Sequence, residues 1–152
     1  ALWEALNNDR IDVIATDHAP HTIEEKSKKY IDCPSGGPLV QHGLVSMIQH
    51  YLNKKISLEK IVTKMCHNPA DLFQIEKRGY IKKGYFADLV LLDLNSPWKV
   101  EKNNILYKCK WSPFEDVVFD SKVTQTFVNG NLVYDNGKFK NELHGIRLTF
   151  ER

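Results

Sequence analysis

The alternation of apolar and polar positions predicts a short strand, a long loop and a helix in the first third of the chain. Residues 11–16 form an apolar, β-branched run with almost no polar interruption, which is typical of a buried strand. Residues 17–38 contain three prolines, two glycines and a charged middle, and a loop of this length is usually functional or disordered. Residues 39–52 then have helical spacing, and one side of this helix carries Leu44, Met47, Ile48 and Tyr51.

Two further helices are expected before residue 76. Ser57 is predicted to be the N-cap of the first, with Lys60 at the position where a capping box has Glu. The buried stripe of that helix is predicted to be Leu58, Ile61, Val62 and Met65. Asn68 is expected to cap a short third helix that runs through Phe73, with Pro69 in its first turn.

The pattern then changes from helical to β. Residues 87–94 predict a strongly apolar strand, and residues 98–100 and 147–150 could form two more. A hairpin is predicted around Asn129-Gly130-Asn131, because Asn and Gly tolerate positive φ and apolar runs flank them at residues 123–128 and 132–134.

This change of pattern places a boundary near residues 76–79. We expect a mixed strand–helix part over residues 1–76 and a mostly β part over residues 77–152. The chain does not begin with Met, and its first six residues resemble the middle or end of a helix. The expectation is therefore a piece of a longer protein.

Composition excludes several classes of function. Of 152 residues, 42% are apolar and 26% are charged, which is ordinary for a globular protein. The net charge of +2 gives no electrostatic argument for binding nucleic acid or an anionic membrane. No apolar stretch approaches the roughly 18 residues that span a bilayer. The three cysteines are far apart and form neither a CxxC pair nor a disulfide framework, so a reducing cytoplasm is the expected location.

The segment Thr16-Asp17-His18-Ala19-Pro20-His21 carries the candidate chemistry. A buried strand that delivers an acid to its carboxyl end is how an α/β barrel presents a catalytic or metal-binding carboxylate. An ordinary strand that ends in a polar turn would look the same as far as Asp17. The second histidine, four residues after the acid, distinguishes this string from such an ordinary turn.

Over essentially its whole length, the chain resembles the carboxyl-terminal part of a dihydroorotase, a member of the amidohydrolase superfamily. The most specific match is the string from Asp17 to His21, because related hydantoinases and allantoinases tend to carry another residue at the position of His21. Asn68-Pro69-Ala70, Arg78-Gly79-Tyr80, Ala87-Asp88-Leu89-Val90 and Val128-Asn129-Gly130 resemble motifs shared across the superfamily.

The resemblance implies a fold and a reaction. The fold class would be α/β: the last strand and helices of a (β/α)8 metal-dependent hydrolase barrel, followed by the carboxyl-terminal half of a small β-sandwich. The reaction would interconvert N-carbamoyl-L-aspartate and dihydroorotate in de novo pyrimidine biosynthesis, with one or two zinc ions that polarise the carbonyl and generate a hydroxide.

The resemblance also assigns roles to individual residues. Asp17 would be a metal ligand that accepts a proton and passes it to the departing amide nitrogen. His21 would contact the substrate, and Ser35 and Gly36 would hold its ring through backbone groups. His18 is expected to be structural or to orient its neighbours.

Several alternatives remain open. Most metal ligands of the family are missing from this chain, which alone should have little or no activity. The complete protein could instead be a hydantoinase or an allantoinase, or a non-catalytic dihydroorotase-like subunit that binds a partner enzyme. A small-molecule substrate is expected, with no nucleic acid and no membrane as partner. A homodimer and a complex with a transcarbamoylase are both compatible with the resemblance.

Overall fold

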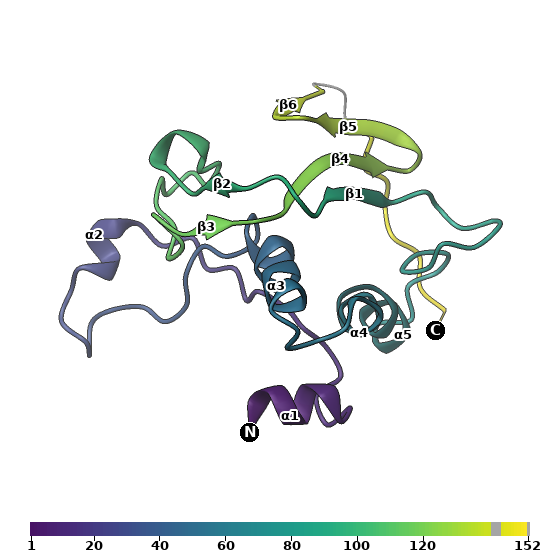
Figure 1. Ribbon diagram of the computed structural model, residues 1–152, viewed down its shortest axis with the longest axis horizontal. Helices are drawn as coiled ribbons and strands as arrows, with labels where there is room; N and C mark the ends of the chain where they lie inside the picture. Colours follow the sequence, from purple (N-terminus) through teal and green to yellow (C-terminus); the bar gives the residue numbers. More distant parts are fainter. Residues whose placement is uncertain (141–143, 152) are drawn as a thin grey trace.

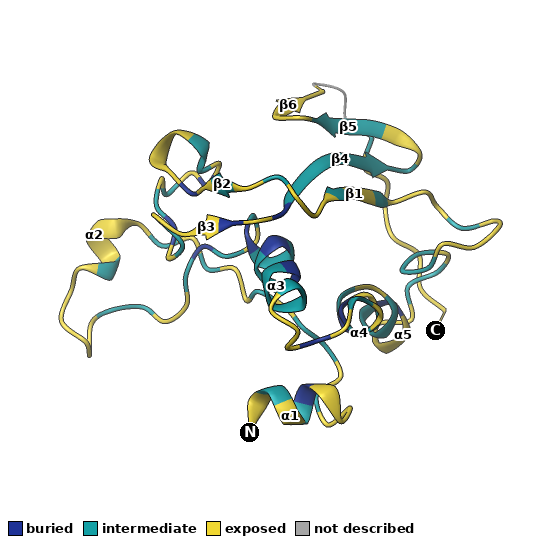
Figure 2. Ribbon diagram, in the orientation of Figure 1, coloured by how far each residue is buried: buried dark blue, intermediate teal, exposed yellow. Residues whose placement is uncertain are grey.

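The computed structural model describes residues 1–140 and 144–151 and shows a mixed α/β arrangement. Two small antiparallel sheets lie above a group of helices, and a long loop carrying one short helix projects to one side (Figure 1). Figure 2 shows that buried residues gather on the helices beneath the sheets, whereas the projecting loop is largely exposed. Within the described residues, no helix is long and apolar enough to cross a membrane.

Six helical segments occur among the described residues. They are α1 (Leu2–Asn7), α2 (Ile23–Lys26), α3 (Gly43–Leu52), α4 (Leu58–Val62), the π-helix η1 (Thr63–His67) and α5 (Asn68–Leu72). The β part of the chain adds one 3-10 turn among the described residues, η2 (Lys102–Asn104). The short helix α2 was missed, because its four residues lie within the run that the sequence predicts as loop. The predicted apolar side of α3 is confirmed, since Ile48 is fully buried and Leu44, Met47 and Tyr51 pack around it.

The predicted cap at Ser57 is confirmed, because its side chain accepts a hydrogen bond from the backbone N–H of Lys60. The predicted cap at Asn68 is wrong. Asn68 has helical backbone angles, so the chain continues from α4 through η1 into α5 without a new start. The Asn68 side chain instead donates a hydrogen bond to the carbonyl of Asp12 at 2.7 Å. Val62, predicted to be buried, is 38% exposed.

Residues 11–16 do not form a strand, contrary to the prediction. A strand requires a neighbour for its backbone ladder, and none lies beside this segment in the part of the chain that the structure describes. Its backbone is held by helices instead, because the N–H of Ile14 donates to the carbonyl of Lys64 at 3.0 Å. Ile11 and Ile14 pack against the helical core, but no residue of this run is buried and Ala15 is exposed, so the predicted burial of the segment is also wrong.

An ion-pair cluster fixes the start of this segment. Asp9 accepts hydrogen bonds from Lys60 at 2.8 Å and pairs with the buried Lys64 at 2.9 Å. The hydrogen bond from Lys60, followed by that from Lys64, lowers the pKa of the Asp9 carboxyl. The end of α1 is thereby attached to α4 and η1.

The larger sheet has the strand order β1-β4-β5-β6. Its strands are β1 (Leu89–Asp93), β4 (Lys122–Val128), β5 (Asn131–Asp135) and β6 (Lys138–Phe139), and β2 (Trp98–Lys99) pairs with β3 (Val118–Phe119) in a second sheet. The hairpin between β4 and β5 is confirmed, with Asn129 and Gly130 at φ of 51° and 82°. The strand predicted over residues 147–150 is wrong, since only Phe150 forms an isolated bridge, to Ile75.

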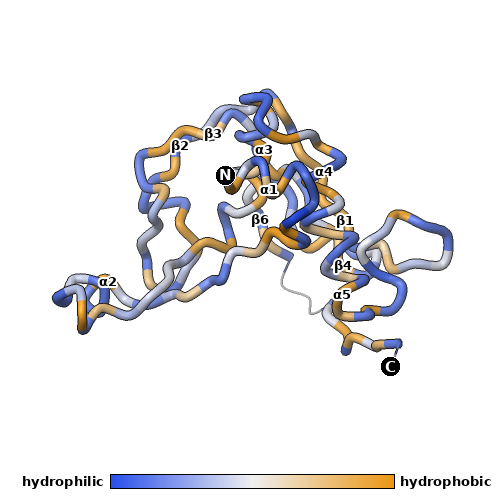
Figure 3. The backbone as a smooth tube through the Cα atoms, turned by 90° about the horizontal axis from the view of Figure 1, so that it is seen from below, coloured by the Kyte–Doolittle hydropathy of each residue, from blue (hydrophilic) through white to orange (hydrophobic). Residues whose placement is uncertain are grey.

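Two apolar clusters meet at α3. Leu6, Ile48, Ile56 and Ile61 form the first, between the helices, and Leu92 of β1 packs against it. Val45 on the other side of α3 packs with Val100 and Phe119 of the β region in the second. The tube in Figure 3 shows the long loop with α2 extending away from this centre. The division at residue 76 stays a prediction.

Candidate functional site

Asp17 lies on a sharp backbone turn. Its φ of 44° is in the left-handed region, which is uncommon for non-glycine residues and which Asp adopts more readily than most of them. The residue is exposed, and the structure gives its carboxylate no hydrogen bond or ion pair with any described residue. The acid is therefore presented outward from the described part of the chain, open to groups outside it.

The turn after Asp17 is docked on residues 36–40. Ala19 donates its N–H to the carbonyl of Gly37 at 2.9 Å, and His18 forms a parallel bridge with the same glycine. The Nδ1 atom of His18 accepts hydrogen bonds from the N–H groups of Leu39 at 3.1 Å and Val40 at 3.3 Å. This is the positioning role expected for His18.

Two glycines allow this close approach. Gly36 has a φ of 81°, and a Cβ atom there would lie 2.8 Å from the Cβ of Ala19 and 3.9 Å from the carbonyl oxygen of Asp17. A Cβ on Gly43 would lie 2.5 Å from Cγ2 of Thr16. Because no side chain fits at these positions, the backbone of residues 36–43 can lie directly against the Asp17 turn.

His21 lies where the turn enters α2. Its carbonyl accepts a hydrogen bond from Nε1 of Trp111 at 2.7 Å, and its Nδ1 lies 3.6 Å from a carboxylate oxygen of Glu25. Glu25 is itself fixed by the capping box that it forms with Thr22. The hydrogen bond from the backbone of Thr22 is the main cause that lowers the pKa of Glu25. The carboxylate is thus held beside the imidazole.

Ser35 is exposed and directly precedes Gly36 in the chain. The neighbouring carbonyl of Pro34 accepts a hydrogen bond from Nζ of Lys26 at 2.7 Å, and Cys33 Sγ lies 3.5 Å from the carbonyl of Lys26. Helix α2, which begins just after His21, is therefore tied to the segment that leads into Ser35 and Gly36. The structure brings the backbone around the four predicted site residues into one region, and their roles toward a substrate stay predictions.

Sequence reasoning missed the aromatic support of this region. Trp111 and Tyr107 come from the β part of the chain, yet Trp111 contacts His21 and the Tyr107 ring lies 5.2 Å from the His18 ring. Only the aromatic residue types mark these positions in the sequence, and nothing there indicates which loop they meet.

His42 is a second feature of the region that the sequence does not reveal. The imidazole is fully buried at the start of α3, and its Nδ1 lies 3.1 Å from Oγ of Ser112 and 3.3 Å from the hydroxyl of Tyr107. Its Nε2 has no partner among the described groups. Burial lowers the pKa of His42, so the neutral ring is favoured.

The described residues do not form a metal centre by themselves. No group of three or more His, Cys, Asp or Glu side chains in residues 1–140 and 144–151 is arranged to hold an ion. Zinc in proteins takes at least three protein ligands, and Asp17 supplies one carboxylate. The carboxylate of Asp17 is a donor type that suits zinc, but the donors among the described residues are too few to hold the ion.

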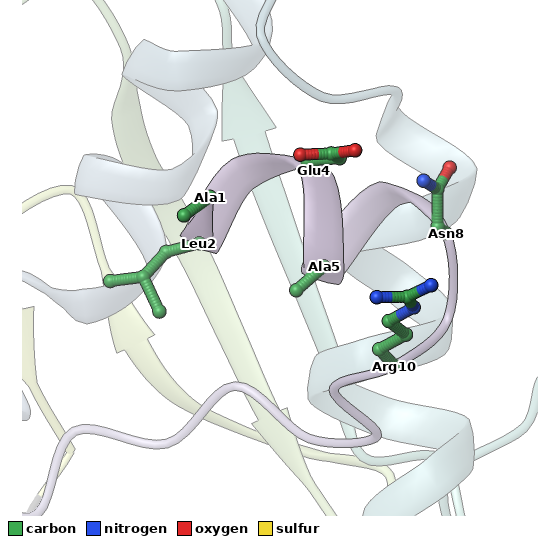
Figure 4. Close-up of a pocket in the computed structure, with 6 residues that line it drawn as sticks. All are labelled: Ala1, Leu2, Glu4, Ala5, Asn8 and Arg10. Atoms are coloured by element: carbon green, nitrogen blue, oxygen red, sulfur yellow. The ribbon is translucent and has the colours of Figure 1, made fainter.

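A hollow of about 310 Å³ lies elsewhere, along α1 (Figure 4). Its lining comes from the first ten residues, with Glu4 and Arg10 as the charged members. None of the predicted site residues reaches it, so we do not assign the candidate site to this hollow.

Comparison with known proteins identifies the class. The profile of the Amidohydrolase family matches residues 1–133, and the chain belongs to that family. It is 39% identical over 135 residues to a dihydroorotase of Halobacterium salinarum, which aligns with 89% of this chain and 32% of the relative. It is 32% identical over 149 residues to a dihydroorotase of Pyrococcus furiosus, covering 98% of this chain and 34% of the relative. The resemblance to dihydroorotases is confirmed, and the chain spans about a third of these relatives' length.

Solved structures give the same kind of fold. An L-hydantoinase (dihydropyrimidinase) from Arthrobacter aurescens superposes with a TM-score of 0.86 at 33% identity, covering 93% of this chain and 32% of that one. A D-hydantoinase (dihydropyrimidinase) from Thermus sp. has a TM-score of 0.81 at 26% identity, covering 93% of this chain and 32% of that one. The mixed α/β class is thereby confirmed.

Proposed function

We propose that this chain is the carboxyl-terminal part of a longer dihydroorotase, which interconverts N-carbamoyl-L-aspartate and dihydroorotate in de novo pyrimidine biosynthesis in the cytoplasm. The identity of 39% to a dihydroorotase supports the substrate. The observation that carries the proposal is the exposed Asp17, held on a turn with a φ of 44° against Gly36 and Gly37.

The proposed whole is a (β/α)8 barrel with an attached β-sandwich, divided near residue 76. Residues 11–16 would be the last barrel strand. This run has the apolar composition of such a strand, and it lacks only a neighbour to pair with. With one barrel strand and most metal ligands elsewhere, the chain alone should have little or no activity.

The proposed roles follow from the side chains. Asp17 is the group that accepts a proton and passes it to the departing amide nitrogen, because a free carboxylate can do both. His21 donates a hydrogen bond to a carboxylate or ring carbonyl of the substrate. The backbone beside Ser35 and Gly36 contacts the ring. One or two zinc ions, ligated by Asp17 together with residues outside this chain, would supply Lewis-acid chemistry in the complete protein.

The second candidate is a hydantoinase, and the structural match at a TM-score of 0.86 favours it. The two are separated by assaying the complete protein, purified with its own metal content, against dihydroorotate, hydantoin and allantoin. Turnover of dihydroorotate well above the other two supports our proposal. Preferred turnover of hydantoin or allantoin would replace it, and no turnover of any of them would favour a non-catalytic subunit that binds a transcarbamoylase or another partner.

A further inference from the structure

Trp111 contacts both parts of the candidate site. Its Nε1 donates a hydrogen bond to the carbonyl of His21 at 2.7 Å, across 90 residues of sequence. Its ring atom Cη2 lies 3.7 Å from the position of a Cβ on Gly37, at van der Waals distance. One half-buried indole therefore lies against the His21 turn and against the glycine segment that would hold the substrate ring.

The segment that carries this indole is attached to the same region. The N–H of Gln41 donates to the hydroxyl of Tyr107 at 2.8 Å. The Gln41 side chain accepts from the N–H of Leu106 at 2.9 Å and donates to the carbonyl of Asn104 at 2.8 Å. Residues 104–111, which we call the brace segment, thus contact both His21 and Gln41, near the two ends of the long loop. A displacement of Trp111 alone would leave these other bonds intact.

We propose that Trp111 is a positioning residue, which holds the backbone of His21 at a fixed distance from Gly36 and Gly37 and so sets the affinity of the site for its substrate. The substrate part of this inference rests on the function proposed above. Trp111 is not a catalytic residue, because its contacts are with the backbone of His21 and with Gly37.

The physical argument concerns spacing. Groups that hold a substrate must lie within a fraction of an ångström of their productive positions, and small displacements far from the chemistry weaken the reaction. Without the indole N–H, the carbonyl of His21 loses its bond to the brace segment. His21 then keeps the hydrogen bond from its own N–H to Ala19 at 2.9 Å, and its link to Gly37 runs only through Ala19, whose N–H donates to the Gly37 carbonyl.

The chain offers a matched control. Nε1 of Trp98 donates to the carbonyl of Ser121 at 2.9 Å, the same type of bond from another half-buried indole. Trp98 packs beside Phe119 and His42, and none of these contacts is with His21 or with Gly36 and Gly37. Trp98→Phe therefore removes an equivalent hydrogen bond without touching His21 or the glycine segment.

The test compares Trp111→Phe and Trp98→Phe in the complete protein by hydrogen exchange over residues 17–26 and by steady-state kinetics with dihydroorotate. We expect Trp111→Phe to speed exchange in this segment about five-fold and Trp98→Phe to leave it unchanged. The KM should rise about three- to ten-fold in Trp111→Phe, with kcat nearly constant, because substrate and transition state lose the same contact.

Equal exchange in the two variants would overturn the proposal, as would a fall in kcat at constant KM. Should Trp111→Phe fail to fold, Trp111→Met removes the same N–H without adding another donor and is read in the same way. The exchange measurement needs no turnover. If the wild-type protein does not act on dihydroorotate, the proposed function fails, and the exchange difference still decides whether Trp111 positions His21.

Discussion

Adding one methyl group at Gly36 tests how the candidate site is assembled. Two costs apply to Gly36→Ala. The φ of 81° places an alanine in the left-handed region, which costs roughly 1–2 kcal/mol. The new Cβ would also lie 2.8 Å from the Cβ of Ala19, and relieving such a contact typically costs about 1–3 kcal/mol. The expected loss in the free energy of unfolding is about 2–5 kcal/mol.

Gly84→Ala separates the two costs. Gly84 has a nearly equal φ of 85°, and a Cβ there meets nothing within 4 Å. This variant therefore pays only for the backbone conformation, about 1–2 kcal/mol. The assay is the urea midpoint of the complete protein for both variants, followed by the KM for dihydroorotate.

We expect Gly36→Ala to unfold at lower urea than Gly84→Ala and to raise the KM, since Ala19 must move and takes the Asp17 turn with it. Gly84→Ala should leave the KM unchanged. Equal midpoints and equal KM values in the two variants would refute the close packing of Gly36 against the turn.

Two further predictions concern stability. Burial lowers the pKa of His42 in the folded state, so the stability that this residue contributes is present above its ordinary pKa of about 6.5 and is lost as the pH falls below that value. We therefore expect His42→Asn to flatten the acid side of the curve of unfolding free energy against pH, measured by urea unfolding. An unchanged slope would contradict this. Ser57→Ala should lower the free energy of unfolding by about 1 kcal/mol, because the N–H of Lys60 loses the hydroxyl that caps it. Ser27→Ala, the control, removes a hydroxyl that only donates to the carbonyl of Ile23 and should cost less. Equal losses in the two variants would count against the cap.

Local rules predicted much of the fold. Helical spacing located α3, the cap at Ser57 located α4, and Asn129-Gly130 located the β4–β5 hairpin, since each depends on a few neighbouring residues. The misses have a different origin. Asn68 has the residue type of a cap, but the helix before it does not stop, and the amide binds Asp12 instead. Residues 11–16 have a strand's composition, and a strand also depends on a partner that local sequence does not describe.

The candidate site likewise combines features that local sequence predicts with features that depend on tertiary contacts. The motif from Asp17 to His21 was readable because its members are adjacent. The partners of His18 at Leu39 and Val40, and that of His21 at Trp111, are set by tertiary contacts across 21, 22 and 90 residues. No periodicity or spacing in the chain encodes these contacts.

The proposed reaction depends on the carboxylate of Asp17 as the group that moves the proton. The most direct measurement is the kcat of Asp17→Asn for dihydroorotate in the complete protein, with its urea midpoint measured beside it. We expect kcat to fall by at least about 100-fold at an unchanged midpoint, because the amide keeps the shape of the side chain and cannot accept the proton. Turnover within a few-fold of the wild type would contradict the assignment.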